Sequence, residues 1–182
     1  MRALVLAALL VLAGAASAQD PETFGLYADP ELTQSTVSVG SGTSTITAYL
    51  ALTELPEYWD VLRIGFADVA LVPSAGIVSI TPVGPVIYRD TDPDPLQFVL
   101  FWDDCQSPTD GTYLVQTFEI VVSPQASIER IDLTGSFDDF AQVGTCVPSG
   151  NFTNSTIKVG LEIMSPVSAD GQSWGAVKSL FD

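Results

Sequence analysis

The chain has 182 residues, of which 22 are acidic, six are basic and none is histidine, so its formal net charge is −16 at pH 7. A surface this acidic repels phosphate backbones and anionic lipid headgroups, which excludes nucleic-acid binding and disfavours binding to membranes. The absence of histidine excludes Ser-His-Asp and Cys-His catalytic triads and the imidazole zinc sites of metalloenzymes.

Residues 1–18 have the pattern of a secretory signal peptide. Arg2 is followed by an apolar run from Ala3 to Leu12 and then by the small residues Ala16-Ser17-Ala18. The apolar run is shorter than the roughly 20 residues that a membrane-spanning helix needs, so cleavage before Gln19 is favoured over a membrane anchor. We therefore expect a protein that is exported, either to the extracellular space or to the periplasm.

From Asp20 onward, short apolar segments alternate with clusters of Gly, Pro, Asp, Ser and Thr. This pattern predicts an all-β fold, a two-sheet antiparallel β-sandwich, in one domain over residues 19–172. The predicted strands are Phe24–Tyr27, Thr36–Val39, Thr43–Leu52, Val61–Phe66, Val69–Val72, Ile77–Ile80, Val86–Tyr88, Leu96–Trp102, Tyr113–Val122, Ile128–Leu133 and Thr156–Met164. A loop is predicted from Asp138 to Asn154.

The strand Tyr113–Val122 is predicted to lie well inside a sheet, because it is rich in β-branched and aromatic residues. Side chains two positions apart in a strand point to the same side. The residues expected to face the core are Leu114, Phe118, Ile120 and Val122 in this strand, Leu62, Ile64 and Phe66 in an earlier one, and Ile157, Val159, Leu161 and Ile163 in the last. Gln116 interrupts the apolar face.

Cys105 and Cys146 are the two cysteines of the chain. In an exported protein a disulfide between them is favoured over two free thiols. Closing the loop between them stabilises a fold by roughly 4 kcal/mol on the chain-entropy model. An immunoglobulin domain is disfavoured, because its tryptophan lies between the two cysteines whereas Trp102 precedes both.

The last segment, residues 173–182, contains Trp174, Val177 and Phe181 at spacings of three and four. This spacing predicts a short helix, capped by Ser173, that packs its aromatic side on the sandwich. The alternative is a peptide recognised by export or attachment machinery. Docking is favoured because a single aromatic face explains the pattern without a receptor.

Asp90, Asp92 and Asp94 are the candidate metal ligands. Three carboxylates at alternate positions of one loop present the hard oxygen ligands that Ca²⁺ prefers. The glycine and the later glutamate of an EF-hand loop are missing, and Pro93 and Pro95 stiffen the segment. A solvated acidic loop is therefore favoured over a calcium site, and we expect no other cofactor.

Tyr58 and Trp59 lie in a connection between two predicted strands. Aromatic rings in loops can stack on sugar rings, which makes this pair the candidate carbohydrate contact. An aromatic loop that closes one end of the core is the favoured alternative.

The order of several segments resembles the cohesin-type β-sandwich of secreted bacterial modules. The segments are Thr45–Leu52, Leu55-Pro56, Leu62–Phe66, Ile77–Pro82, Phe98–Trp102, Asp110-Gly111 and Leu114–Val122, within roughly residues 36–135. Cohesins bind dockerin modules in assemblies of polysaccharide-degrading enzymes, and related sandwiches bind carbohydrate. The resemblance thus implies an extracellular protein or polysaccharide as partner. The cysteine pair and the Trp174 segment lie outside it, and it assigns no binding residues.

The sequence carries no phosphate-binding loop and no dinucleotide motif. Among hydrolytic mechanisms, paired carboxylates acting on a glycosidic bond remain practicable. A small sandwich without a recognisable site is more often a binding or structural module than an enzyme. We therefore predict a non-catalytic extracellular module for protein–protein interaction or a structural role. A carbohydrate-binding module is the first alternative, and a carboxylate glycoside hydrolase is the second.

Overall fold

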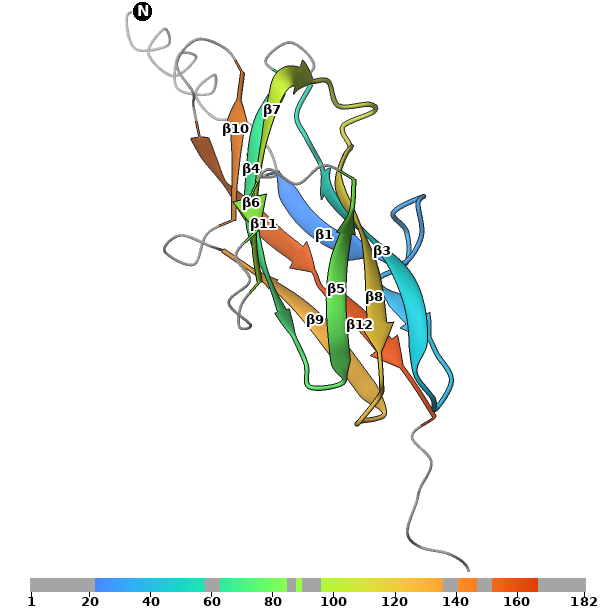
Figure 1. Ribbon diagram of the computed structural model, residues 1–182. Coiled ribbons are helices and arrows are strands. Elements are labelled where there is room, and N and C mark those ends of the chain that lie inside the picture. Colours follow the sequence, from blue (N-terminus) through green and yellow to red (C-terminus); the bar gives the residue numbers. More distant parts are fainter. Residues whose placement is uncertain are drawn as a thin grey trace, which may run out of the picture.

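The computed structural model describes residues 22–57, 63–84, 88–89, 96–135, 141–146 and 152–166 (Figure 1). All regular elements in these ranges are β-strands, as predicted, and no helix that could cross a membrane occurs there. The strands are β1 Thr23–Tyr27, β2 Thr36–Ser38, β3 Ser44–Thr53, β4 Ile64–Pro73, β5 Ile77–Val83, β6 Tyr88–Arg89, β7 Leu96–Gln106, β8 Tyr113–Val122, β9 Ile128–Thr134, β10 Ala141–Thr145, β11 Phe152–Val159 and β12 Leu161–Met164.

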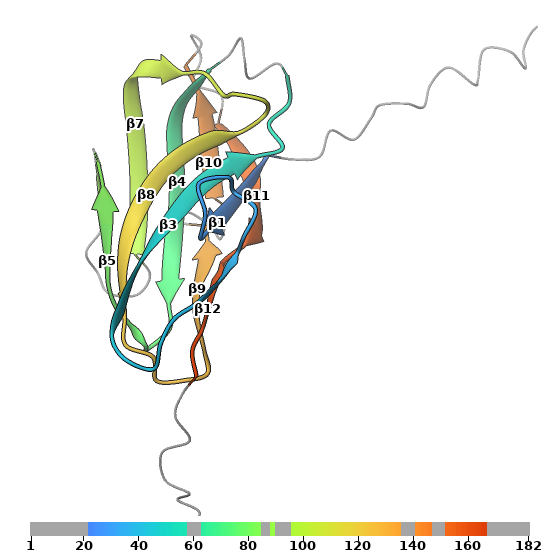
Figure 2. The same cartoon turned by 90° about the vertical axis from the view of Figure 1, so that its right-hand side faces the viewer.

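The strands form two layers, so the predicted sandwich is confirmed. One layer has the order β1-β3-β8-β5, and the other contains β2-β12-β9-β4-β10, with β7 beside β4 and β6 beside β7. In Figure 2, β8 and β3 pass in front of β4. β11 belongs to both layers, because Phe152–Ser155 pairs with β10 and Thr156–Val159 pairs with β1.

The pairing is antiparallel with two exceptions among the described strands, β1 with β11 and β12 with β2. In both, a strand from the C-terminal part of the chain runs alongside a strand from its N-terminal part. The predicted antiparallel sandwich is therefore confirmed, and these two parallel pairs are features that the sequence did not indicate.

Apolar side chains from both layers meet in one core. Phe98 of β7 and Phe118 of β8 pack edge to face, with ring centroids 4.9 Å apart. Phe118, Ile120 and Val122 are fully buried, which confirms the predicted core side of β8. Burying a side chain of this size contributes about 1.5–3 kcal/mol, so these positions account for much of the stability of the sandwich.

Leu114 does not face the core, contrary to prediction. Leu50 of β3 pairs with Gln116, whereas the next residue, Ala51, pairs with Leu114, so Val115 is an extra residue in β8. Beyond such a β-bulge, each side chain points to the opposite side of the sheet from the one that simple alternation predicts. Val115 is consequently buried, and Leu114 is 46% exposed on the outer side of the sheet.

The segments Val61–Phe66 and Val69–Val72, predicted as two strands, form one strand, β4, over the part that the structure describes. A shift in register between Ile64 and Phe66 inverts the alternation here too. Ile64 is buried in the core together with Ala67, Val69 and Leu71, while Phe66 lies on the other side and is half-buried. The expectation that Phe66 shares the core face of Ile64 is therefore wrong, and Leu62 lies outside the described residues.

The predicted loop Asp138–Asn154 contains β10, whose Ala141 and Val143 are buried between β4 and β11. The predicted strand Thr156–Met164 is divided at Gly160. A Cβ atom at Gly160 would lie 2.4 Å from the carbonyl oxygen of Ile131, so the chain passes too close to β9 for any side chain. β11 then pairs with β1, and β12 pairs with β9.

Candidate interaction surface

Most residues that the sequence singled out for chemistry lie outside the described residues. Tyr58 and Trp59, the candidate sugar contacts, lie outside them, as do the candidate calcium ligands Asp90, Asp92 and Asp94. The signal segment 1–18 and the terminal segment 173–182 also lie outside. Within the described ranges, no three acidic or cysteine side chains are grouped so that they could hold a metal ion.

The predicted disulfide between Cys105 and Cys146 is present, with the two Cα atoms 5.9 Å apart. Cys105 lies near the end of β7 and Cys146 directly follows β10, and both strands pair with β4. A Cβ atom at Gly65 of β4 would lie 2.7 Å from Cys146 Sγ. The disulfide therefore joins two strands across β4, and the absence of a side chain at Gly65 leaves room for the sulfur.

Three neighbouring strands, β3, β8 and β5, present one continuous outer side. Glu119 of β8 lies between Thr47 of β3 and Thr81 of β5, because it is the pairing partner of both. The residues on this side are Thr45, Thr47, Tyr49, Ser79, Thr81, Val83, Leu114, Thr117, Glu119 and Val121. We call this set the open face. Figure 2 shows the three strands side by side.

The open face combines exposed apolar side chains with hydroxyl groups. Val83 is 53% exposed and Leu114 is 46% exposed, and the threonines at 45, 47 and 81 are exposed as well. Glu119 is the one charged residue of the set, in a chain with 22 acidic side chains. A shortage of charge together with exposed apolar groups is typical of the central part of protein–protein interfaces.

Glu129 of β9 is a buried carboxylate, 2% exposed, on the same side as Ile131 and Leu133. Its oxygens accept hydrogen bonds from the Ser74 hydroxyl and from the backbone N–H groups of Gly76, Gln125 and Ala126. Burial by itself would raise the pKa of Glu129, but these four donors together lower it below the ordinary value. Because the donors occupy both oxygens, this carboxylate fixes two turns and is not presented to a substrate.

Sequence reasoning did not single out Glu129. The signal was available, since Glu129 stands two residues before Ile131 and four before Leu133 and so shares their side of the strand. A charged residue in phase with core positions indicates a buried polar centre rather than a solvated one.

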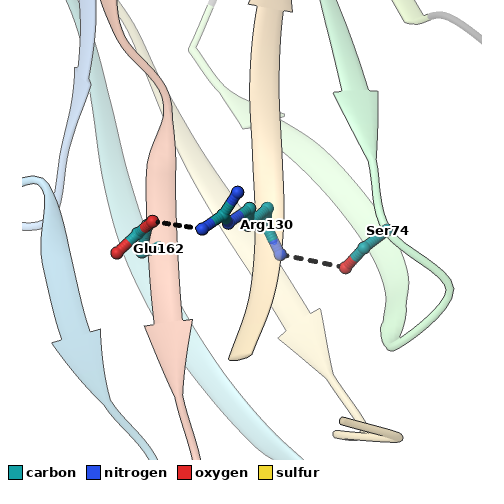
Figure 3. A network of polar contacts seen from close by, with 3 residues as sticks. All are labelled: Ser74, Arg130 and Glu162. Atoms are coloured by element: carbon teal, nitrogen blue, oxygen red, sulfur yellow. Dashed lines mark hydrogen bonds and ion pairs between the residues drawn. The ribbon is translucent and has the colours of Figure 1, made fainter. Parts of the chain in front are cut away.

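The outer side of β9 and β12 carries the polar network of Figure 3. The Arg130 guanidinium lies 2.9 Å from Glu162 Oε1, and the Arg130 backbone N–H donates to Ser74 Oγ at 3.0 Å. Both charged side chains are about half exposed, so the ion pair contributes about 0–1 kcal/mol. It borders a shallow depression of about 260 Å³ that is lined by Ser35, Arg130, Asp132, Gly160, Leu161 and Glu162.

No protein-family model matches the chain, and no curated protein matches it. Several solved structures are similar to it in fold. A cohesin module from a family 33 glycoside hydrolase of Clostridium perfringens ATCC13124 superposes with a TM-score of 0.54 at 14% identity, over 80% of this chain and 97% of the module. A non-cellulosomal cohesin from Archaeoglobus fulgidus gives 0.54 at 8% identity, over 87% and 97% of the two chains. The seventh ScaB type I cohesin from Pseudobacteroides cellulosolvens gives 0.50 at 10% identity, over 84% and 96%.

The fold is therefore a cohesin-like β-sandwich, and the resemblance seen in the sequence is confirmed at the level of the fold. At these identities the likeness concerns the arrangement of the strands. It assigns no partner and no binding residue to this chain.

Proposed function

We propose that the protein is an exported, non-catalytic module that binds a folded protein partner through the open face. The observation that carries this proposal is the composition of that face: exposed valine, leucine and threonine side chains on three adjacent strands, with Glu119 as the one charge among them. The cohesin-like fold supports a role in interaction, because cohesins are protein-binding modules.

The geometry of the open face suits a pre-formed binding surface. The β3–β8 and β8–β5 ladders hold the backbone of all three strands, so little conformational entropy is lost when a partner binds. The threonine hydroxyls donate and accept hydrogen bonds, while Val83 and Leu114 offer apolar area.

The net charge of the chain determines which kinds of partner surface it attracts. A net charge of −16 attracts a basic or neutral surface and repels an acidic one. We therefore propose a partner with an apolar patch and one lysine or arginine placed opposite Glu119. An uncharged polysaccharide would gain nothing from this electrostatic attraction.

A non-catalytic role is supported by the chemistry of the described residues. Histidine is absent, and the buried carboxylate Glu129 is engaged by hydroxyl and backbone donors. The open face supplies threonine hydroxyls and one exposed carboxylate, which is not the pair of opposed carboxyl groups that glycoside cleavage requires.

The test uses Leu114→Asp and the matched control Ile128→Asp. Leu114 and Ile128 are 46% and 44% exposed, and they lie in opposite layers. A protein captured from the extracellular fraction of the source organism on the immobilised full chain is identified, purified and titrated calorimetrically. We expect Leu114→Asp to weaken its binding about tenfold or more, because it buries an unpaired charge at the interface centre, and Glu119→Lys to do the same, because it sets a cation against the partner's cation. Ile128→Asp should bind as the natural chain does.

Equal affinity of all three variants for the purified partner would overturn the proposal. So would binding to a polysaccharide array that Leu114→Asp abolishes, because the open face would then be a carbohydrate site.

A further inference from the structure

A second exposed apolar site lies on the other layer of the sandwich. Ile128 of β9 and Met164 of β12 are direct pairing partners and are 44% and 43% exposed. The next pair on the same side is Arg130 with Glu162, and the depression at Gly160 follows. We call this surface the β9–β12 strip, and its members are Ile128, Met164, Arg130, Glu162, Asp132, Gly160 and Ser35. Two apolar side chains opposite each other form a patch that a single exposed residue does not.

The chain leaves the sandwich beside this strip at a fixed point. The Ser165 backbone N–H donates to the Ser127 carbonyl oxygen at 3.0 Å, and the Ser165 hydroxyl donates to the Ala126 carbonyl oxygen at 3.1 Å. These bonds hold the residue after Met164 against the turn between β8 and β9. Whatever follows in the chain therefore starts next to Ile128 and Met164.

The sequence that follows is amphipathic. Residues 167–182 contain Trp174, Val177, Leu180 and Phe181, together with Lys178 as the one cation. The β9–β12 strip offers the complement, with the apolar pair at one end and the carboxylates of Asp132 and Glu162 towards the other. The Arg130 guanidinium, which is half exposed, is available to stack on an aromatic ring.

We propose that the segment Ser173–Phe181 of this same chain docks on the β9–β12 strip, with its aromatic side chains over Ile128 and Met164 and with Lys178 beside Asp132 and Glu162. The reach is sufficient. Trp174 lies eight positions after Pro166, a span of up to about 26 Å, whereas the four steps from Gly160 to Met164 cover about 13 Å of strand.

The connection also favours this occupant over a separate molecule. A short flexible linker gives the segment an effective concentration of about a millimolar at the strip. An external peptide of the same sequence would need that concentration in solution to compete. The net charge of −16 further opposes the approach of a second copy.

Met164 provides a direct readout. The chain contains two methionines, Met1 and Met164, and oxidation of a methionine to its sulfoxide by peroxide slows when the thioether is covered. The full chain is treated with hydrogen peroxide, and the tryptic peptide 159–178 is followed by mass spectrometry. We expect Met164 to oxidise about threefold or more faster in Trp174→Ala/Phe181→Ala than in the natural chain, because the substitutions uncover the sulfur.

Two further variants sharpen the test. Ser168→Ala/Gln172→Ala, which changes two polar residues in the connection just before the segment, is the matched control and should oxidise at the natural rate. Ile128→Asp, which damages the receiving surface, should accelerate oxidation to the rate of the aromatic double variant. Adding Ile128→Asp to that double variant should give no further change, because both remove the same contact.

Equal oxidation rates in the natural chain and in Trp174→Ala/Phe181→Ala would overturn the proposal. Protection that rises with protein concentration and accompanies a dimer on size-exclusion chromatography would also overturn it, since the segment would then cover a second copy. Circular dichroism of each variant verifies that the sandwich itself is intact.

Discussion

At the scale of single residues, Glu129 shows how one side chain can organise one end of the sandwich. Its carboxylate accepts hydrogen bonds from Ser74 and Gly76 in the turn between β4 and β5, and from Gln125 and Ala126 in the turn between β8 and β9. The second of these turns also holds the chain at Ser165. One buried charge thus fixes the two turns that frame the exit of β12.

Glu129→Gln is expected to destabilise the fold by about 2–3 kcal/mol at pH 7. The glutamine amide group replaces one acceptor oxygen by a donor, so at least one buried backbone N–H loses its partner. Urea unfolding of both proteins measures the difference. Glu119→Gln, at the exposed glutamate of β8, is the control and should leave stability unchanged. Equal stability of Glu129→Gln and the natural chain would show that the turns do not depend on the carboxylate.

The same carboxylate makes the stability of the protein depend on pH. The pKa of Glu129 is lowered on folding from its ordinary value of 4.5, so the folded state binds its proton less readily than the unfolded state. Its contribution is therefore complete above pH 4.5 and is lost as the pH falls through the lower, folded pKa. We expect the difference in unfolding free energy between the natural chain and Glu129→Gln to shrink below pH 4.5. A difference that stays constant down to pH 2 would contradict this assignment.

At the scale of the strands, two-residue alternation predicted where strands lie better than which way their side chains point. β8 occupies the predicted range, Tyr113–Val122, but the bulge at Val115 turns Leu114 outward. A bulge depends on the register of the partner strand, which the local sequence does not encode. The division at Gly160 likewise follows from a backbone that passes close by, at Ile131.

The open face could not be predicted from the sequence, for a related reason. Alternation identifies Thr47, Thr81 and Glu119 as outward-facing residues, but it does not tell which strands are neighbours or whether another segment covers them. Pairing of β3, β8 and β5 brings together residues more than 30 positions apart. Loop motifs such as Asp90-Thr-Asp92 stand out in a sequence, whereas a binding surface composed of threonine and valine does not.

Gly65→Ala tests the crossing of the disulfide over β4. The new methyl group would lie 2.7 Å from Cys146 Sγ, and the bond to Cys105 prevents the sulfur from moving away, so we expect a loss of about 1–3 kcal/mol. In a Cys105→Ser/Cys146→Ser background the clash is free to relax, and the same substitution should cost less. Gly40→Ala, where a Cβ atom meets nothing within 4 Å, is the control in thermal unfolding. If Gly65→Ala lowers stability equally in both backgrounds, its cost does not come from a clash with the disulfide.

At the scale of the whole molecule, the net charge of −16 acts on the folded state as self-repulsion. Added salt screens this repulsion, so unfolding temperature should rise with ionic strength in any chloride salt. A calcium site at Asp90, Asp92 and Asp94 would add a specific increment, because a ligand that binds the folded state alone stabilises it.

Magnesium distinguishes the two effects, because Mg²⁺ carries the same charge as Ca²⁺ and screens equally, but it dehydrates reluctantly and fits a flexible carboxylate loop poorly. Since a solvated acidic loop is favoured, we expect equal rises in unfolding temperature in equimolar CaCl₂ and MgCl₂. An additional rise in CaCl₂ that disappears in Asp90→Asn/Asp92→Asn/Asp94→Asn would instead establish the loop as a calcium site. The triple asparagine variant also carries three fewer negative charges than the natural chain. Because its self-repulsion is weaker, its unfolding temperature should rise less steeply with sodium chloride than that of the natural chain.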